Sequence, residues 1–270
     1  MKNWALALCL WILAFTIHAE TLVIPGTGAS EVLLKRVAED FQRQYPQDRV
    51  QIPPSVGSSS GIKAVINNDA IMARVGRPLN ETEANAGLKQ WVFARDAVAF
   101  AVGESVTIHA LSSNQLADIY SGQINNWSAL GGPSAPIRVL VREATETSSK
   151  VLQRAFPSLQ RIAMIESAKL VNHDYEMIDL LDKYKTALGW ITASSLPGAH
   201  TGVKLLTIDG ASPVLPEMAS GHYPALLEFS LVFKEERLND IARRFVAYLS
   251  SPAGQQSLKN NGVLAAEASR

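Results

Sequence analysis

The chain has 270 residues, and its 25 basic side chains are matched by 25 acidic ones. Zero net charge with 47% hydrophobic residues excludes a disordered polyelectrolyte, and it argues against a protein that binds nucleic acid through a broad basic face. The single cysteine excludes an internal disulfide and cysteine-based zinc sites. The length suits one large domain or two small ones.

Residues 1–19 have the pattern of a secretory signal peptide. Lys2 is their only charge, an apolar run extends from Trp4 to Ile17, and the small residue Ala19 offers a cleavage point. The run is short for a membrane span, which needs about 20 apolar residues. No later segment is as long and uncharged. We therefore expect export, cleavage after Ala19 and no stable membrane anchor afterwards; the alternative is an uncleaved N-terminal anchor.

Short strands and helices alternate at the start of the mature chain. Strands are expected at residues 21–24, 49–53 and 70–75, and helices at residues 31–45 and around 62–66. This order implies a parallel sheet with helices on its faces.

The long apolar segment from Trp91 to Val102 predicts either a strand pair or one strand that crosses between two units. Further strands are expected at residues 137–141, 188–192 and 223–233, and further helices near residues 116–120, 150–156, 175–184, 239–249 and 254–260. We therefore expect two α/β lobes joined by strand-like crossings, with the C-terminal helices returning to the first lobe.

Three turns share one construction: a strand end, then small or hydroxyl residues, then a helix start. They are Gly26–Ser30, Gly57–Gly61 and the segment from Arg142 to Ser149. A helix N-terminus has unpaired N–H groups and about half a positive charge, so such turns suit an anion, although each alone could be only a helix cap. Arg142 could bind a tetrahedral oxyanion with its planar fork or make a surface salt bridge. Arg77 is a second candidate.

Other motifs in the sequence give weaker evidence for a function. No dinucleotide or Walker A fingerprint is complete, and the histidines lack metal-ligand spacing, so we expect no cofactor and no metal. Ser60-Gly-Ile-Lys63 matches the S-x-x-K of penicillin-recognising serine hydrolases. The two companion motifs are broken, because Ser112–Asn114 lacks the aspartate and Lys185–Ala187 lacks the glycine. We therefore expect no enzyme, with this hydrolase as the alternative.

Several segments together resemble the periplasmic phosphate-binding protein family, the type II solute-binding proteins of ABC importers: Gly26–Ser30, Gly57–Lys63, Arg77–Leu79, Ile119–Gly132 and Arg142–Glu143. The resemblance covers most of the mature chain. It implies an α/β fold of two lobes, each a mixed sheet flanked by helices, with a ligand cleft between them. The lobes would comprise residues 20–98 plus 222–270 and residues 99–221.

The resemblance also implies a function. A periplasmic protein would capture phosphate or a related tetrahedral oxyanion and deliver it to the membrane subunits of an importer. A binding-protein-like domain with an altered ligand, used for sensing or adhesion, is the alternative.

Carried over position by position, the resemblance implies ligand contacts at Ser30, Ser58, Ser59, Arg142 and Ser148. The chain departs from the family twice. Gly76, beside Arg77, stands where well-known members have an aspartate that accepts the proton of hydrogen phosphate. Glu146 stands at a phosphate-contacting serine, where its carboxylate would either repel a dianion or take over the role of the missing aspartate.

Overall fold

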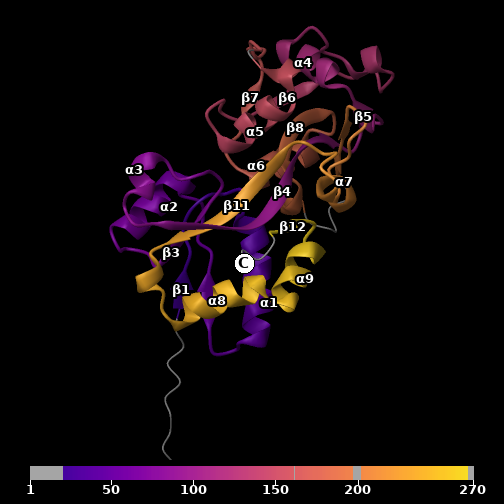
Figure 1. The fold of residues 1–270 in the computed structure, drawn as a ribbon. Coiled ribbons are helices and arrows are strands. Elements are labelled where there is room, and N and C mark those ends of the chain that lie inside the picture. The colour runs from indigo at the N-terminus through magenta and orange to yellow at the C-terminus, as the bar shows by residue number, and fades with distance from the viewer. Residues whose placement is uncertain (1–20, 161, 197–201, 267–270) are drawn as a thin grey trace, which may run out of the picture.

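The computed structural model describes residues 21–160, 162–196 and 202–266, so the expected signal peptide lies outside the described residues. The chain forms two α/β lobes, and the 15-residue strand β4 (Lys89–Gly103) passes from one to the other (Figure 1). In the described part of the chain, no helix has the length and apolar character needed to cross a membrane.

The first lobe contains the alternation expected from the sequence. β1 (Thr21–Val23) pairs in parallel with β2 (Arg49–Gln51), and an isolated parallel bridge joins Gly26 to β3 (Met72–Val75). β11 (Leu226–Phe233) then lies antiparallel between β3 and β4. The parallel arrangement expected from strand order is therefore right for the first three strands, and the returning strand β11 makes the lobe mixed.

The second lobe extends the same sheet from the other half of β4. From Val98 onward, β4 pairs antiparallel with β8 (Ala187–Thr192) and β9 (Val203–Leu205). β8 is followed in the sheet by β6 (Arg138–Val141) and β7 (Lys169–Leu170). Three short strands complete the set: β5 (Ala110–Leu111), β10 (Thr207–Ile208) and β12 (Leu264–Ala265).

The apolar segment from Trp91 to Val102 is one strand, as the second of the two sequence interpretations expected. It pairs with β11 up to Ala97 and with β8 from Val98, so one continuous strand belongs to both lobes. Its side chains from Ala97 to Val102 are all buried, because helices cover both faces of the sheet. The lobe boundaries at residues 98–99 and 221–222 stay predictions.

The helices follow the expected periodicity with small differences at their ends. Those of the first half of the chain are α1 (Glu31–Gln44), α2 (Gly57–Ile66), α3 (Glu81–Ala84) and α4 (Ser113–Ser121). Those of the second half are α5 (Thr147–Ala155), α6 (Asp174–Lys183), α7 (Leu215–Ala219), α8 (Asp240–Ser250) and α9 (Pro252–Asn260). α3 and α7 have only four and five residues, and no helix was expected at either place.

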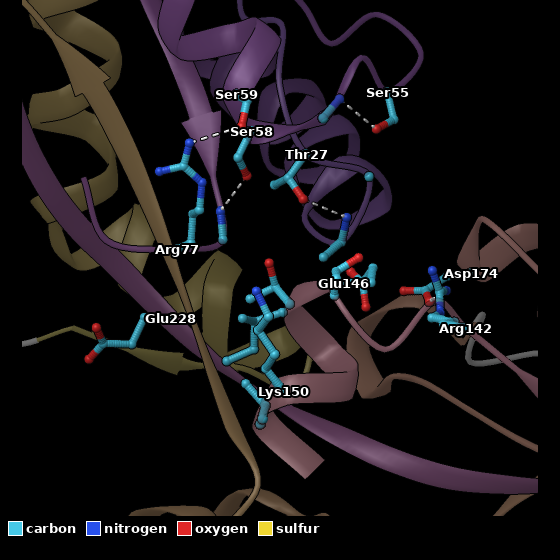
Figure 2. Close-up of a pocket in the computed structure, with 18 of the residues that line it drawn as sticks. Thr27, Ser55, Ser58, Ser59, Arg77, Arg142, Glu146, Lys150, Asp174 and Glu228 are labelled. Atoms are coloured by element: carbon cyan, nitrogen blue, oxygen red, sulfur yellow. Dashed lines mark hydrogen bonds and ion pairs between the residues drawn. The ribbon is translucent and has the colours of Figure 1, made fainter. Parts of the chain in front are cut away.

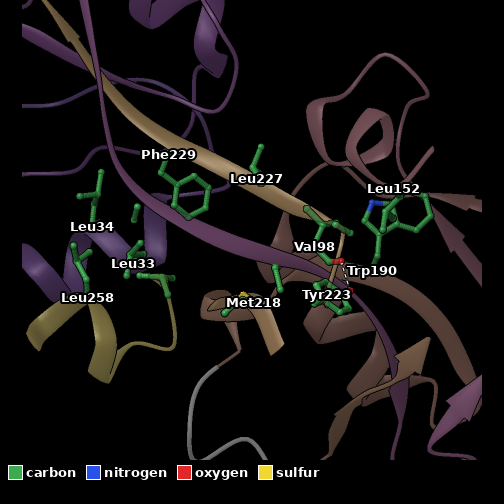
Figure 3. Packing of buried hydrophobic residues seen from close by; sticks show 14 of the residues in the cluster. Leu33, Leu34, Val98, Leu152, Trp190, Met218, Tyr223, Leu227, Phe229 and Leu258 are labelled. Atoms are coloured by element: carbon green, nitrogen blue, oxygen red, sulfur yellow. Dashed lines mark hydrogen bonds between the residues drawn. The ribbon is translucent and has the colours of Figure 1, made fainter. Parts of the chain in front are cut away.

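The two C-terminal helices pack against α1, where Phe41 meets Phe245 edge-on at 5.2 Å between ring centroids. Burial continues from there along β11 into the second lobe, so both lobes share one apolar core. Figure 3 follows this core through Leu33, Leu34, Leu258, Phe229, Leu227, Val98, Leu152 and Trp190. The Tyr223 hydroxyl donates to the Val98 carbonyl at 2.7 Å. This bond holds the segment that returns to the first lobe, just before β11, against β4.

Candidate functional site

A cleft of about 1120 Å³ lies between the lobes, and all three turns singled out in the sequence line it (Figure 2). The first lobe contributes Thr27–Ala29 before α1 and Gly57–Ser59 at the start of α2. The second lobe contributes Arg142 and Thr145–Thr147 before α5. A fourth helix start, at α6, adds Asn172–Asp174. The pattern of small and hydroxyl residues that marks the other three turns is absent from this fourth one.

The two first-lobe helices that begin at the cleft, α1 and α2, receive no side-chain hydrogen bond from their N-cap residues, although the Ser55 Oγ accepts the Gly57 N–H at 3.3 Å. Neither Ser30 before α1 nor Val56 before α2 caps the following backbone N–H groups. Thr27 lines the cleft beside α1. Ser30 is fully buried, is not among the cleft-lining residues, and its Oγ has no hydrogen-bond partner among the described residues. Uncapped helix starts at a cleft provide N–H donors for an anion.

Ser58 and Ser59 both line the cleft, as the resemblance implies. The Ser58 Oγ accepts the N–H of Gly76 at 3.2 Å, and the Ser59 Oγ accepts from the Arg77 Nη2 at 3.0 Å. Because each hydroxyl acts as acceptor in these bonds, its own proton remains available to donate. These two serines therefore add hydroxyl donors to the N-terminus of α2.

Arg74 holds both first-lobe turns in position. Its side chain is fully buried and donates to the carbonyls of Thr27 and Pro53 at 2.8 Å each, and also to the Ile24 carbonyl. Burial lowers the pKa of Arg74 to about 10, against a smaller opposing effect of Glu31, so the side chain stays charged at neutral pH. Nothing in the sequence singles out Arg74, because a strand sequence does not show which carbonyls will surround one side chain.

Arg77 lines the cleft but is paired within its own lobe. Its Nη1 and Nη2 contact the Glu83 carboxylate at 2.7 and 2.8 Å. These hydrogen bonds raise the pKa of Arg77 and lower the pKa of Glu83. Arg77 therefore orients Ser59 and the cleft wall, while Glu83 compensates its charge.

Arg142 lies at the end of β6, is largely buried and lines the cleft. It forms an ion pair with Asp174 and donates to the Asn172 carbonyl at 2.9 Å. The side chain therefore reaches the cleft and has a carboxylate partner, although not at the surface. Its contact with an oxyanion stays a prediction. Asp174 lies 32 residues further along the chain, a distance at which no local pattern signals the pairing.

Asp174 also links the lobes. Its second oxygen accepts from Ser195 Oγ at 2.9 Å and contacts the Thr192 hydroxyl. Thr192 Oγ1 in turn lies 3.2 Å from the Ala29 carbonyl, at the start of α1 in the other lobe. The arginine of one lobe and the first helix of the other therefore belong to one hydrogen-bonded group.

Glu146 is the N-cap of α5, and its carboxylate lies where an anion would bind that helix (Figure 2). Glu146 Oε2 accepts the N–H groups of Ser148 at 2.8 Å and Ser149 at 3.4 Å, as well as the Ser148 hydroxyl. Trp190 Nε1 donates to that hydroxyl at 3.0 Å. Ser148 is thus fully engaged and is not among the cleft-lining residues.

The hydrolase alternative has no geometric support. Ser60 and Lys63 are both exposed on α2, and neither is among the residues that line the cleft. Within residues 21–160, 162–196 and 202–266, no group of three or more histidine, cysteine, aspartate or glutamate side chains could hold a metal ion.

A two-lobed α/β fold with polar turns lining the cleft between the lobes is the architecture of the solute-binding proteins. The family model for the PBP superfamily domain matches residues 17–253, and the chain belongs to this family. It is 24% identical over 214 residues to the phosphate-binding protein PstS of Borreliella burgdorferi, covering 77% of each protein. It is 25% identical over 244 residues to PstS of Bacillus subtilis, covering 88% of this chain and 78% of that protein.

Solved structures agree in fold. A Clostridium perfringens protein, assigned as a phosphate ABC transporter substrate-binding protein and containing bound phosphate, superposes with a TM-score of 0.79. It is 25% identical, with 92% of this chain and 100% of that chain covered. An ABC-type phosphate transport receptor from Vibrio cholerae has a TM-score of 0.65 at 25% identity, with 90% and 99% covered.

Proposed function

We propose that this chain is an exported solute-binding protein that captures phosphate or a related tetrahedral oxyanion for an ABC importer. The observation that carries the proposal is the convergence of two uncapped helix N-termini, α1 and α2, on one interlobe cleft. The phosphate-binding relatives and the phosphate-bound structural neighbour support it. The protein would be periplasmic after loss of residues 1–19, and it would not act as an enzyme.

In this mechanism the first lobe supplies neutral donors and the second lobe supplies charge. The N–H groups of α1 and α2 and the hydroxyls of Thr27, Ser58 and Ser59 would replace the hydration shell of the anion. Arg142, held by Asp174, would face the anion from the opposite side. Ser30 and Ser148 remain candidate contacts that need a rearrangement to reach the cleft. Closure of the lobes excludes water and strengthens each of these bonds.

Glu146 fits the role of proton acceptor better than that of a repelling charge. All three of its hydrogen bonds go to Oε2, and Oε1 has no partner among the described residues. A carboxylate oxygen facing a cleft is satisfied by a ligand that carries an O–H group. Gly76 leaves the first-lobe wall without a carboxylate at that position, so Glu146 would accept the proton of hydrogen phosphate.

Calorimetry tests this function. Phosphate titrated into the purified mature protein is expected to give a 1:1 isotherm, weakened at least tenfold in Arg142→Ala because a charged donor is lost. Arg49→Ala, on the exposed face of β2, serves as control and leaves the affinity unchanged. If phosphate, sulfate and molybdate all give no heat, the proposal fails.

The role of Glu146 has its own test. Sulfate carries no proton at neutral pH, so wild-type protein should bind it at least tenfold more weakly than phosphate. In Glu146→Gln an amide N–H can face the ligand, and this preference is expected to shrink or reverse. A phosphate-to-sulfate ratio that is the same in both proteins would contradict the role of Glu146 and leave the cleft proposal standing.

A further inference from the structure

Two cationic side chains in the cleft have no partner among the residues that the structure describes. The cleft is lined by five lysine and arginine side chains and by three acidic ones, although the whole chain is neutral. Three of the arginines are paired: Arg77 with Glu83, Arg95 with Glu228 at 3.0 Å, and Arg142 with Asp174. The remaining two cations are Lys150 and Arg154. Neither head group forms a hydrogen bond or ion pair with any described residue.

Their place on α5 gives the two cations a common direction. Positions i and i+4 of a helix lie on the same face, about 5–6 Å apart. With a rise of about 1.5 Å per residue, Lys150 lies ~6 Å and Arg154 ~12 Å along the helix axis from Glu146. In Figure 2, Lys150 lies on the far side of Glu146 from the Arg142–Asp174 pair. The cations therefore mark an outer part of the cleft. The inner site is the proposed oxyanion site between Arg142 and the N-termini of α1 and α2.

We expect closure of the lobes on a ligand to take these two charges out of water. Both side chains are exposed in the present structure, where water solvates them. Two neighbouring like charges repel each other slightly on an open helix. Glu146, four residues before Lys150, can offset only one of them, and burying the other without a counter-ion would be much more costly. A ligand with an anion at this position would remove that penalty, whereas an inorganic phosphate held at the inner site would leave it in place.

We propose that Lys150 and Arg154 form a second anion subsite, and that the preferred ligand is a phosphorylated solute with a second anionic group. The inference rests on the proposed function, because the inner site must hold the first phosphoryl group. The second group can be another phosphoryl, as in inorganic pyrophosphate, or a carboxylate, as in phosphoglycolate.

Competition between ligands tests the subsite. Wild-type protein is titrated with phosphate, pyrophosphate and phosphoglycolate, and at least one of the two larger anions is expected to bind at least tenfold more tightly than phosphate. In Lys150→Gln/Arg154→Gln this advantage should fall to about one, with phosphate affinity changed by less than threefold. The two larger anions distinguish a phosphoryl from a carboxylate as the second group.

Lys63→Gln is the matched control, because Lys63 is an exposed helical cation outside the cleft. Equal wild-type affinity for all three anions, or an advantage that persists in the double variant, overturns the subsite while phosphate binding still supports the proposed function. Stopped-flow association rates offer a second readout. If they fall equally for all three ligands in the double variant while the affinity ratios stay unchanged, the two cations act by electrostatic steering, and the subsite is overturned as well. If no anion binds, the proposed function fails and the subsite with it.

Discussion

At the scale of single residues, Arg74 connects the interior of the first lobe to the cleft. Three backbone carbonyls from two different turns converge on its guanidinium, and Glu31 lies 3.5 Å away. Carbonyls that leave water need a donor, and a planar group with five N–H donors can serve several at once. The geometry of both anion-binding turns therefore depends on one side chain that does not itself line the cleft.

Replacing Arg74 with methionine is expected to lower the free energy of unfolding by about 3 kcal/mol or more, because buried carbonyls lose their donors. Arg74→Lys should recover only part of this, since an ammonium cannot span the same acceptors. Urea denaturation measures both variants, with exposed Arg49→Met as control. Equal stability of wild type and Arg74→Met would show that the carbonyls find other partners.

At the scale of secondary-structure elements, α2 approaches the first turn unusually closely. A Cβ on Gly61 would lie 2.9 Å from the Gly26 Cα and 3.2 Å from the Ala73 Cβ. Gly26 itself has φ +142°, and a Cβ there would collide with the Arg74 carbonyl. The two glycines therefore let helix and turn pack backbone to backbone, which brings the N-termini of α1 and α2 into the same cleft.

Gly61→Ala sets two effects against each other. Alanine favours a helix by about 1 kcal/mol over glycine, whereas overpacking against backbone costs about 1–3 kcal/mol. We expect a net destabilisation of about 1 kcal/mol in thermal or urea unfolding, together with weaker phosphate binding because α2 moves away. Ser60→Ala, exposed on the same helix, should be neutral or stabilising. If Gly61→Ala were as stable as Ser60→Ala, the close approach would have room to relax.

At the scale of the whole molecule, Asp96 lies where β4 leaves the first lobe. Its Oδ2 accepts the N–H of Ser194, just beyond β8 in the second lobe, at 3.1 Å, and its Oδ1 has no partner among the described residues. Complete burial raises the pKa of Asp96 to about 7; the bond from Ser194 opposes this, and nearby Asp174 adds a smaller increase. A carboxyl group at the junction of the lobes therefore titrates near neutral pH.

The sign of the resulting pH dependence is fixed by linkage. An unfolded aspartate has a pKa near 3.9, so between about pH 4 and pH 7 the folded state binds the extra proton and stability falls as pH rises. From pH 5 to pH 8, wild type should lose about 2 kcal/mol more than Asp96→Asn in urea unfolding. Exposed Asp69→Asn should follow wild type. Parallel pH profiles for wild type and Asp96→Asn would contradict a raised pKa.

The prediction of the secondary structure succeeded where local patterns are strong. The helical periodicity of residues 31–45 predicted α1, and the Trp91–Val102 segment predicted a strand long enough to join two lobes. The strands β5, β7 and β10 have only two residues each, too few for a periodicity to show. Of the predicted ligand contacts, the structure places Ser58, Ser59 and Arg142 at the cleft but not Ser30 and Ser148, and contact with a ligand stays a prediction.

By itself, the sequence determined the α/β class, the order of the elements and the three small-residue turns, because helical periodicity, helix-ending prolines and turn glycines act over a few neighbouring residues. Only the tertiary structure decided how charges are shared among the groups in the cleft. Asp174 reaches Arg142 across 32 residues, Glu146 occupies the N-terminus of its own helix, and Lys150 and Arg154 have no hydrogen-bond or ion-pair partner in the described part of the chain. Pairing of charges depends on distances in space, and the folded chain sets those distances.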